Sequence, residues 1–292
     1  MHQILLTGSN GQVGWELRRS LQGLGTIHAP QRGQLDLTDA DAIRAMIRDI
    51  KPSLIINPAA YTAVDKAESE PELARAINAE APAVMAEEAS RLGIPLIHYS
   101  TDYVYAGTGT NPWTEAAPTA PPNMYGVTKL AGEEAIRASG CAHVILRTSW
   151  VYGTRGKNFL LTMLRLGRER EQLSVVADQI GAPTWARSIA DLTAHIVASQ
   201  PDWVDVTGTY HLANGGETSW HGFAEAIFAL AAQKGQKVPG TVAPIATEAY
   251  PTPAARPKNS RLDLSELKDT FGLVPPHWAD ALAMCFDDLP ST

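Results

Sequence analysis

The chain opens with Ile4-Leu5-Leu6-Thr7-Gly8-Ser9-Asn10-Gly11-Gln12-Val13-Gly14, an apolar run that ends in a glycine-rich turn. A short apolar run of this kind predicts a buried parallel strand, and the spacing of Val13, Leu17 and Leu21 predicts a helix after the glycines. A strand, a glycine-rich turn and a helix in this order are typical of a dinucleotide-binding loop. The glycines let backbone N–H groups approach a pyrophosphate, and the helix dipole favours an anion there.

Strand and helix patterns continue to alternate through the first half of the chain. Apolar runs predict further strands near residues 26–29, 53–57, 95–100 and 143–147, and helical patterns lie near 42–50, 72–92 and 125–138. Strands that alternate with helices pair in parallel through right-handed crossovers. The pattern therefore predicts an α/β fold, a Rossmann-like doubly wound parallel sheet.

After residue 150 the pattern loosens and prolines gather near residues 244–257. Helices are expected at 158–170, 188–199 and 220–234, and strands at 173–177 and 209–213. We expect a smaller α/β substrate domain interleaved with the cofactor domain. The predicted division gives residues 1–148 and 174–204 to the cofactor domain, and 149–173 and 205–292 to the substrate domain.

The composition is that of an ordinary globular protein: of 292 residues, 45% are hydrophobic and 19% charged. A net charge of -7 disfavours a nucleic-acid-binding surface. Two cysteines, Cys141 and Cys285, make no disulfide framework, which fits a reducing cytoplasm. The first apolar run is too short for a signal peptide or a membrane span. We expect a cytoplasmic protein with no nucleic-acid or membrane partner, and no residue cluster has metal-ligand spacing.

A candidate catalytic group consists of Thr101, Tyr125 and Lys129. Tyr125 and Lys129 are four residues apart on a predicted helix, so they share one face. A phenol, with an unperturbed pKa of about 10, is a poor catalyst at neutral pH, and a nearby ammonium is expected to lower that pKa. Thr101 follows a predicted strand, in the crevice where ligands bind. A surface tyrosine beside a lysine, with a threonine that caps a turn, is the structural alternative.

The choice of nicotinamide cofactor depends on the end of the second predicted strand. No acidic residue stands there to bind the ribose 2′-hydroxyl of NAD. Arg32 can pair with a 2′-phosphate, which favours NADPH over NADH, although a solvated surface arginine is nearly as good an interpretation. Asp36 either reaches the adenine or caps the helix that begins near residue 40.

These residues resemble the extended short-chain dehydrogenase/reductase family, and further segments resemble its dTDP-4-dehydrorhamnose reductase branch over nearly the whole chain. The segments are AAYTAVDKAE at 59–68, STDYVY at 100–105, RTSWVY at 147–152, DQIGAPT at 178–184 and RPKNSRL at 256–262. They are specific within the wider family, whereas the glycine loop is not.

The resemblance implies a reaction in which NAD(P)H reduces the 4-keto group of dTDP-4-dehydro-L-rhamnose to give dTDP-L-rhamnose. By the same resemblance Tyr125 donates the proton, and Thr101, Asp102 and Trp150 hold the sugar. The residues that line the cofactor are Gly11, Gln12, Val13, Asp36, Leu37, Ala59, Ala60, Tyr61 and Lys129, to which the loop itself adds Gly8 and Gly14.

Several of these side chains have a second interpretation. Trp150 offers a flat face for a deoxysugar but can also be core packing. Arg256 is a candidate for the nucleotide diphosphate, or forms a surface salt bridge. Gln179 contacts the substrate or supports a turn. His98 lies on an apolar strand and is interpreted as a satisfied core histidine.

Two rival functions remain open. A nucleotide-sugar epimerase of the same family keeps the same catalytic residues but consumes no net cofactor. A non-catalytic regulatory homologue belongs to a different class, and the presence of both Tyr125 and Lys129 speaks against it.

The resemblance also concerns assembly, because some members of this reductase family form a dimer bridged by magnesium between acidic side chains. The matching positions here hold Glu16, Arg187 and Asp288. A guanidinium has no lone pair for a metal, so we expect no magnesium-bridged dimer and a monomer or weak homodimer. Arg187 is expected to pair with Glu16 or Asp288 across an interface, or the three are unrelated surface charges.

Overall fold

The computed structural model describes residues 2–199 and 201–289 and is built around a sheet of six parallel strands. The strand order is β10-β5-β4-β3-β1-β2, so the direction of winding reverses between β1 and β3. In such sheets ligands bind at the carboxyl ends of the strands beside the reversal. The strands are β1 (His2–Leu6), β2 (Gly25–His28), β3 (Leu54–Asn57), β4 (Leu96–Thr101), β5 (His143–Thr148) and β10 (Gly208–His211).

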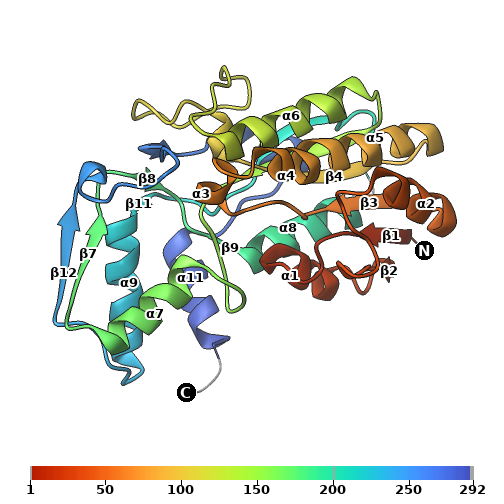
Figure 1. Ribbon diagram of the computed structural model, residues 1–292. Helices are drawn as coiled ribbons and strands as arrows, with labels where there is room; N and C mark the ends of the chain where they lie inside the picture. Colours follow the sequence, from red (N-terminus) through yellow and green to blue (C-terminus); the bar gives the residue numbers. More distant parts are fainter. Residues whose placement is uncertain (1, 200, 290–292) are drawn as a thin grey trace.

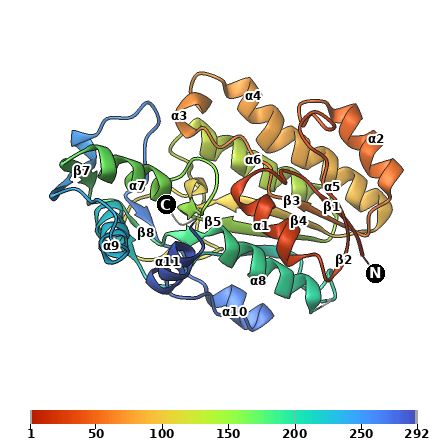
Figure 2. The same cartoon turned by 90° about the horizontal axis from the view of Figure 1, so that it is seen from below.

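Helices cover both faces of this sheet (Figures 1 and 2). One face carries α1 (Gln12–Ser20) and α8 (Ala186–Ala198), and the other carries α2 (Ala40–Ile50), α5 (Ala81–Leu92) and α6 (Met124–Ala138). Each face has its own buried apolar cluster, with Leu6 and Leu17 in the first and Leu5 and Met85 in the second. Alternate residues of β1 thus serve opposite layers, which confirms the doubly wound α/β architecture.

Polar side chains begin the helices that matter for the site. Asp39 accepts hydrogen bonds from the N–H groups of Asp41 and Ala42 and so caps α2. Asn123 accepts one from Gly126 N at 2.9 Å and caps α6. The position of this cap decides where the next turns of α6 face.

The segment predicted as one helix over residues 72–92 is interrupted. It consists of α4 (Pro71–Arg75), a π-helical turn η1 (Ala76–Glu80) and α5, preceded by the short α3 (Val64–Ala67). The buried Asn78 in η1 accepts from Tyr61 N at 2.8 Å and donates to Thr128 Oγ1 at 3.1 Å. The π turn thereby joins the loop after β3 to α6. Such turns inside helices are frequent at functional sites.

A second lobe lies beside the sheet (Figure 1). Its core is formed by α7 (Phe159–Glu169), α9 (Trp220–Gln233) and α11 (Trp278–Asp287), against the parallel pair β7 (Gln172–Val176) and β12 (Thr241–Ile245). The remaining short elements are β6 (Val151–Tyr152), β8 (Ile180–Gly181), β9 (Thr184–Trp185), β11 (Thr218–Ser219), β13 (Asn259–Ser260), η2 (Asp102–Val104), η3 (Thr247–Ala249) and α10 (Ser265–Phe271).

Two strands lie differently from the predicted domain division. β10 joins the large sheet beside β5, although residues 205–292 were predicted to belong to the substrate domain. β7 pairs with β12, although its residues 174–176 were predicted to belong to the cofactor domain. Strand pairing, which decides both placements, has no local sequence signal. Within the part of the chain that the structure describes, no helix is long and apolar enough to cross a membrane.

Candidate active site

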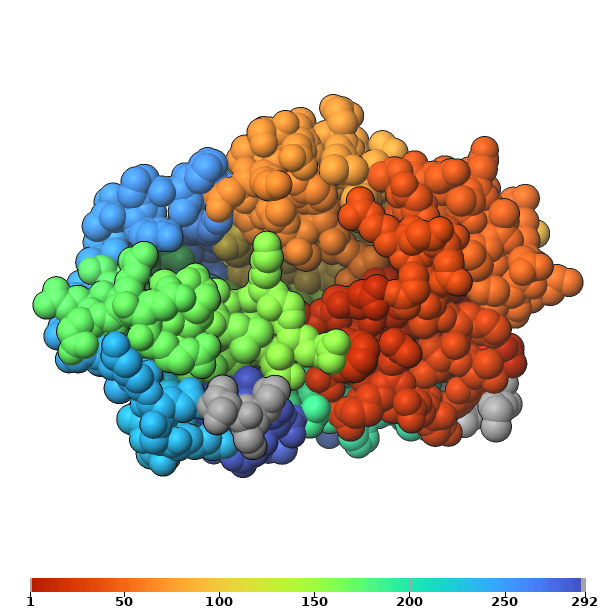
Figure 3. Space-filling view, turned by 60° about the horizontal axis from the view of Figure 1, so that its bottom comes forward, coloured from red at the N-terminus to blue at the C-terminus, as the bar shows by residue number. Residues whose placement is uncertain are grey.

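A cleft lies at the carboxyl ends of β1, β3 and β4, where the strand order reverses. It consists of two adjoining cavities that share Gly8, Gly11 and Ala59. Figure 3 shows a hollow between the red N-terminal part, the orange part and the green segment of the chain. The first cavity is also lined by Arg32, Asp36, Leu37 and Ala60, and the second by Gln12, Val13, Gly14, Ala60, Ser100, Tyr125, Lys129, Thr148 and Lys157.

The glycine loop has the geometry that a dinucleotide requires. Gly8 adopts φ +56°, and a Cβ on Gly14 would lie 2.1 Å from the carbonyl oxygen of Gly8. No side chain caps the start of α1 at Gly11, and its first turn carries no acidic residue. The first N–H groups of α1 are therefore free for an anion, and this observation fits the diphosphate of NAD(P)H.

The far end of the cleft contains the residues predicted to select the cofactor. Arg32 is exposed and lines the first cavity together with Asp36. Asp36 accepts hydrogen bonds from Thr38 N at 3.0 Å and Thr38 Oγ1 at 2.9 Å, and these bonds lower the pKa of its carboxyl. Asp36 therefore stabilises a turn, and the helix cap once considered for it is supplied by Asp39.

Tyr61 is the predicted cofactor residue whose side chain lies away from the cleft. Its phenol donates to Glu70 Oε2 at 2.5 Å, and it lines neither cavity, whereas Ala59 and Ala60 line both. The small side chains of Ala59 and Ala60 leave room for a ligand, whereas the Tyr61 phenol is engaged by Glu70.

Lys129 is buried on α6 and faces β4. Its Nζ donates to the carbonyl oxygen of Tyr99 at 2.6 Å and lies 3.0 Å from Nε2 of His98. Burial lowers the pKa of Lys129 to about 8, opposed by the negative charge of Glu133. An ammonium that loses its proton this close to neutrality can take part in proton transfer.

Tyr125 lies one turn earlier on α6 and lines the second cavity. Burial raises its pKa to about 12, opposed by the Thr101 hydroxyl and reinforced by the charge of Asp102. The pKa of Tyr125 is therefore raised and not lowered as expected, and the ammonium of Lys129 is directed toward His98 and Tyr99. The phenol stays protonated at neutral pH, which suits a proton donor.

Thr101 is the last residue of β4 and Asp102 follows it, and both are buried. Thr101 accepts from Tyr103 N at 3.2 Å and donates to Asp102 Oδ1 at 3.1 Å. Burial raises the pKa of Asp102 to about 6. Its Oδ2 is buried and has no hydrogen-bond partner within 2–199 and 201–289, and neither Thr101 nor Asp102 is among the residues that line the two cavities.

The second lobe holds Trp150 and Gln179 in contacts of their own. Trp150 has φ +50° and stacks on Trp220 with ring centroids 3.6 Å apart, so one face of its ring is occupied. Gln179 accepts from Trp220 Nε1 at 3.1 Å and donates to Thr247 Oγ1 at 3.2 Å. Gln179 thus supports the tryptophan pair, and its turn interpretation fits these bonds.

Arg256 lies between the two lobes. Its guanidinium pairs with Asp65 at 2.8 Å and donates to the carbonyl oxygen of Ala254 at 3.1 Å. This is the salt bridge considered as its alternative role, and it joins the C-terminal segment to α3.

Sequence reasoning missed two hydroxyl groups in the cleft. Ser100 Oγ and Thr148 Oγ1 line the second cavity, are buried, and lack a hydrogen-bond partner among the described residues. They lie at the carboxyl ends of the neighbouring strands β4 and β5, where Thr148 is the register partner of Thr101. The sequence signal was their position beside Thr101 and Ser149 at the two strand ends, where ligand-binding side chains gather.

Comparisons with known proteins agree over nearly the whole chain. The family model "RmlD substrate binding domain" matches residues 1–291. A dTDP-4-dehydrorhamnose reductase of Burkholderia thailandensis is 48% identical, covering 99% of each chain. The chain belongs to the dTDP-4-dehydrorhamnose reductase family. The Escherichia coli K12 reductase of this family is 46% identical, covering 99% of this chain and 98% of its own. The crystal structure of the Bacillus anthracis reductase in complex with NADP superposes with a TM-score of 0.91 at 37% identity, covering 98% of each chain.

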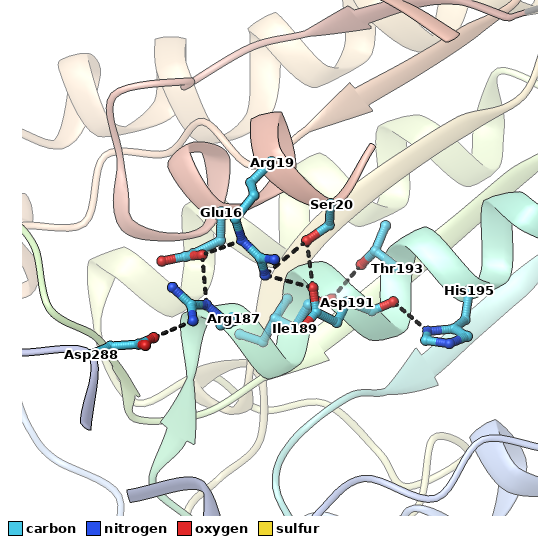
Figure 4. Close-up of polar contacts among 9 residues, drawn as sticks. All are labelled: Glu16, Arg19, Ser20, Arg187, Ile189, Asp191, Thr193, His195 and Asp288. Carbon is cyan, nitrogen blue, oxygen red and sulfur yellow. Dashed lines mark hydrogen bonds and ion pairs between the residues drawn. The ribbon is translucent and has the colours of Figure 1, made fainter. Parts of the chain in front are cut away.

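The three positions at which members of this reductase family were expected to bind magnesium lie together in one chain (Figure 4). Arg187 Nε donates to Glu16 Oε2 at 3.1 Å, and its Nη1 pairs with Asp288. The three are therefore not unrelated surface charges: these ion pairs are internal to the chain and join α1, α8 and the end of α11. Among residues 2–199 and 201–289, no three His, Cys, Asp or Glu side chains are grouped to hold a metal ion.

Proposed function

We propose that this chain reduces the 4-keto group of dTDP-4-dehydro-L-rhamnose to give dTDP-L-rhamnose, with NADPH as the preferred reductant and NADH as a second one. The observation that carries the proposal is that the glycine loop before the uncapped start of α1, Tyr125 and Lys129 line one cavity. Membership of the reductase family supports the substrate class, and the NADP in the Bacillus anthracis structure supports the cofactor.

Different groups of the chain would bind the cofactor, donate the proton and position the sugar. NADPH supplies the hydride when it is bound. The N–H groups at the start of α1 would hold its diphosphate, and Arg32 a 2′-phosphate. Tyr125 would hold a proton on its phenol oxygen and deliver it to the sugar's 4-keto oxygen. Thr101 and Asp102 would position the sugar, because they lie at the carboxyl end of β4 and Asp102 Oδ2 has no partner among the described residues.

Proximity and acid catalysis account for the expected rate. A donor that stays protonated, with a pKa of about 12, is ready at neutral pH. A positioned general acid typically contributes about 10²–10⁴-fold, and holding both reactants together removes an entropic cost of several kcal/mol.

The test incubates the protein with dTDP-4-dehydro-L-rhamnose and NADPH while the nicotinamide absorbance is followed. We expect stoichiometric NADPH loss and formation of dTDP-L-rhamnose. Product formed without net cofactor loss would support the epimerase instead, and cofactor binding without any turnover would support the regulatory homologue.

A further inference from the structure

A row of buried polar side chains crosses the centre of the large sheet. Thr7, Asn57 and His98 lie at the ends of β1 and β3 and within β4, and their exposed fractions are 2%, 1% and 0%. Asn57 and His98 are register partners, and Thr7 follows Leu6, whose partner is Ile56. Two residues earlier on the same strands, the same face carries Leu5, Ile55 and Leu96. Burying polar groups in so apolar a layer costs folding free energy, which suggests that these side chains have a function.

The row ends at Lys129. From Lys129 Nζ the contacts run to His98 Nε2 at 3.0 Å, from His98 Nδ1 to Asn57 Nδ2 at 3.1 Å, and from Asn57 Oδ1 to Thr7 Oγ1 at 2.5 Å. Thr7 lines the first cavity beside Gly8. A continuous buried chain therefore connects the lysine in one cavity with the glycine loop in the other.

The hydrogen positions in this chain are interdependent. A neutral imidazole has one N–H and one lone pair. With Nδ2 of Asn57 toward His98, Nδ1 must accept and Nε2 must carry the hydrogen, so Nζ must present a lone pair and Lys129 must be neutral. A 180° turn of the Asn57 amide reverses the order: His98 Nδ1–H donates to Oδ1, Nε2 accepts from Lys129, and Nδ2 donates to Thr7 Oγ1 in place of the bond that Thr7 otherwise donates to Oδ1.

The reversed order suits both charge states of Lys129. Two N–H bonds of Nζ are held by the carbonyl oxygen of Tyr99 and by Nε2 of His98, whether the amine is charged or neutral. The third position of Nζ then faces away from these two acceptors and carries either a proton or a lone pair. Lys129 can gain or lose this proton without moving.

We propose that His98 is a positioning residue for Lys129, with its proton on Nδ1 held by Asn57 and its Nε2 accepting from the lysine. In this role His98 keeps Nζ in place and stabilises the ammonium form. The proposal deepens the proposed reductase function and rests on it for its kinetic consequences, but not for the hydrogen-bond order itself.

The other titratable and charged groups around Lys129 are engaged elsewhere or protonated, so His98 is the side chain that can accept from its Nζ. From its own helix come Tyr125, which stays protonated, and Glu133, which raises the pKa of Lys129. Glu133 is held by Arg147 of β5, with contacts of 2.9 and 2.6 Å. On β4, the Tyr99 phenol contacts Thr193 at 2.7 Å, and beyond β4 Asp102 acts on Tyr125. Burial and the charge of Lys129 hold the pKa of His98 well below its usual range, so it stays a neutral acceptor.

The first experiment reads the tautomer directly and needs no turnover. The protein is labelled with ¹⁵N-histidine, and the His98 signals are identified by their loss in His98→Gln. We expect a protonated Nδ1 and a lone-pair Nε2 at pH 7, unchanged up to pH 9. A proton on Nε2 would overturn the proposal, whatever the enzyme's activity.

The second experiment compares pH profiles of three variants. His98→Leu removes the acceptor, His98→Gln restores one, and His143→Leu removes a buried imidazole on β5 that bonds Cys141 O instead. Losing the acceptor should lower the pKa of Lys129 by roughly one further unit. The alkaline limb of kcat, and of NADPH affinity measured by nicotinamide fluorescence, should move to lower pH by that amount in His98→Leu alone.

At pH 8 this shift corresponds to an activity loss of about fivefold in His98→Leu, with recovery in His98→Gln. A uniform loss without a shifted limb, or a shift of equal size in His143→Leu, would show a merely structural role. If the wild type consumes no NADPH with the keto sugar, the proposed function fails, while the tautomer and the pH dependence of NADPH binding still decide the role of His98.

Discussion

Tyr125 is the residue on which the proposed reduction depends most directly. Tyr125→Phe removes the proton donor but no group of the glycine loop, so turnover should fall about 10²–10⁴-fold, roughly 3–5 kcal/mol of barrier. NADPH affinity should stay near that of the wild type. Steady-state kinetics and fluorescence titration measure the two effects separately.

Tyr103→Phe is the matched control for this substitution. The Tyr103 ring contacts that of Tyr125 edge-on with centroids 5.7 Å apart, so the variant tests loss of a neighbouring phenol from the same cluster. Near wild-type turnover in Tyr125→Phe would falsify the assigned role.

Arg32 is expected to read the 2′-phosphate. It is exposed at the mouth of the first cavity, so Arg32→Ala should raise the Kd of NADPH by about tenfold and change that of NADH little. Arg44→Ala on α2, which removes a surface ion pair with Glu87, is the control. Equal losses for the two cofactors would return Arg32 to the solvated surface.

At this scale the sequence predicted which side chains gather, but not how they bond. The spacing of Tyr125 and Lys129 places them on one helical face, and the structure has them line one cavity. The contact of Lys129 with His98 depends on how α6 packs over β4. The bond of Tyr61 to Glu70 depends on the course of the loop between them. Neither contact therefore has a signal in the local sequence.

The junction of β1, its glycine turn and α1 is an element-scale test of the cleft. A methyl group on Gly14 would collide with the Gly8 carbonyl oxygen, so Gly14→Ala should destabilise the fold by about 1–3 kcal/mol and weaken NADPH binding. Gly23→Ala, whose added Cβ would meet nothing within 4 Å, should do neither. Urea denaturation and cofactor titration compare the two, and equal behaviour would contradict the close packing described here.

The ion pairs of Arg187 hold three helical segments together. Glu16 is 5% exposed, so Arg187→Met leaves a nearly buried carboxylate whose one remaining charged partner among the described residues is Arg19 at 3.4 Å. We expect a loss of about 1–3 kcal/mol of unfolding free energy, measured in urea. Arg165→Met breaks the exposed pair with Glu169 and should cost less than about 1 kcal/mol. An Arg187→Met protein as stable as the wild type would show that the network contributes nothing.

Elements with a clear period were predictable, and elements defined only by their partners were not. β1, β3, β4 and β5 are buried on both faces and read as apolar runs. β8, β11 and β13 have two residues each, too few to show a period, and exist because they pair with one another. The π turn at Asn78 interrupts a helix whose composition gives no sign of it.

Across the whole molecule, the two lobes meet where the candidate substrate residues lie. Asp65 of α3 pairs with Arg256 of the C-terminal segment, and Gln179 and Trp220 brace Trp150 from the second lobe. A sequence pattern gives the residue types in each segment, whereas the joining of segments about 190 positions apart follows only from the packed fold.

Assembly and metal dependence are the last expectation at this scale. The carboxylates of Glu16 and Asp288 already share an internal cation in Arg187, whose guanidinium offers no lone pair to magnesium. Binding Mg²⁺ there would require several oxygen ligands and would place the ion beside a fixed positive charge. We therefore expect that EDTA changes neither turnover nor the sedimentation coefficient, and that added magnesium has no effect on either.

Arg187→Glu, which replaces the cation by a third carboxylate, is the informative comparison: it should make the stability of the protein sensitive to magnesium. If wild-type activity were lost in EDTA and recovered with magnesium, together with a shift between monomer and dimer, then magnesium and not Arg187 would neutralise Glu16 and Asp288.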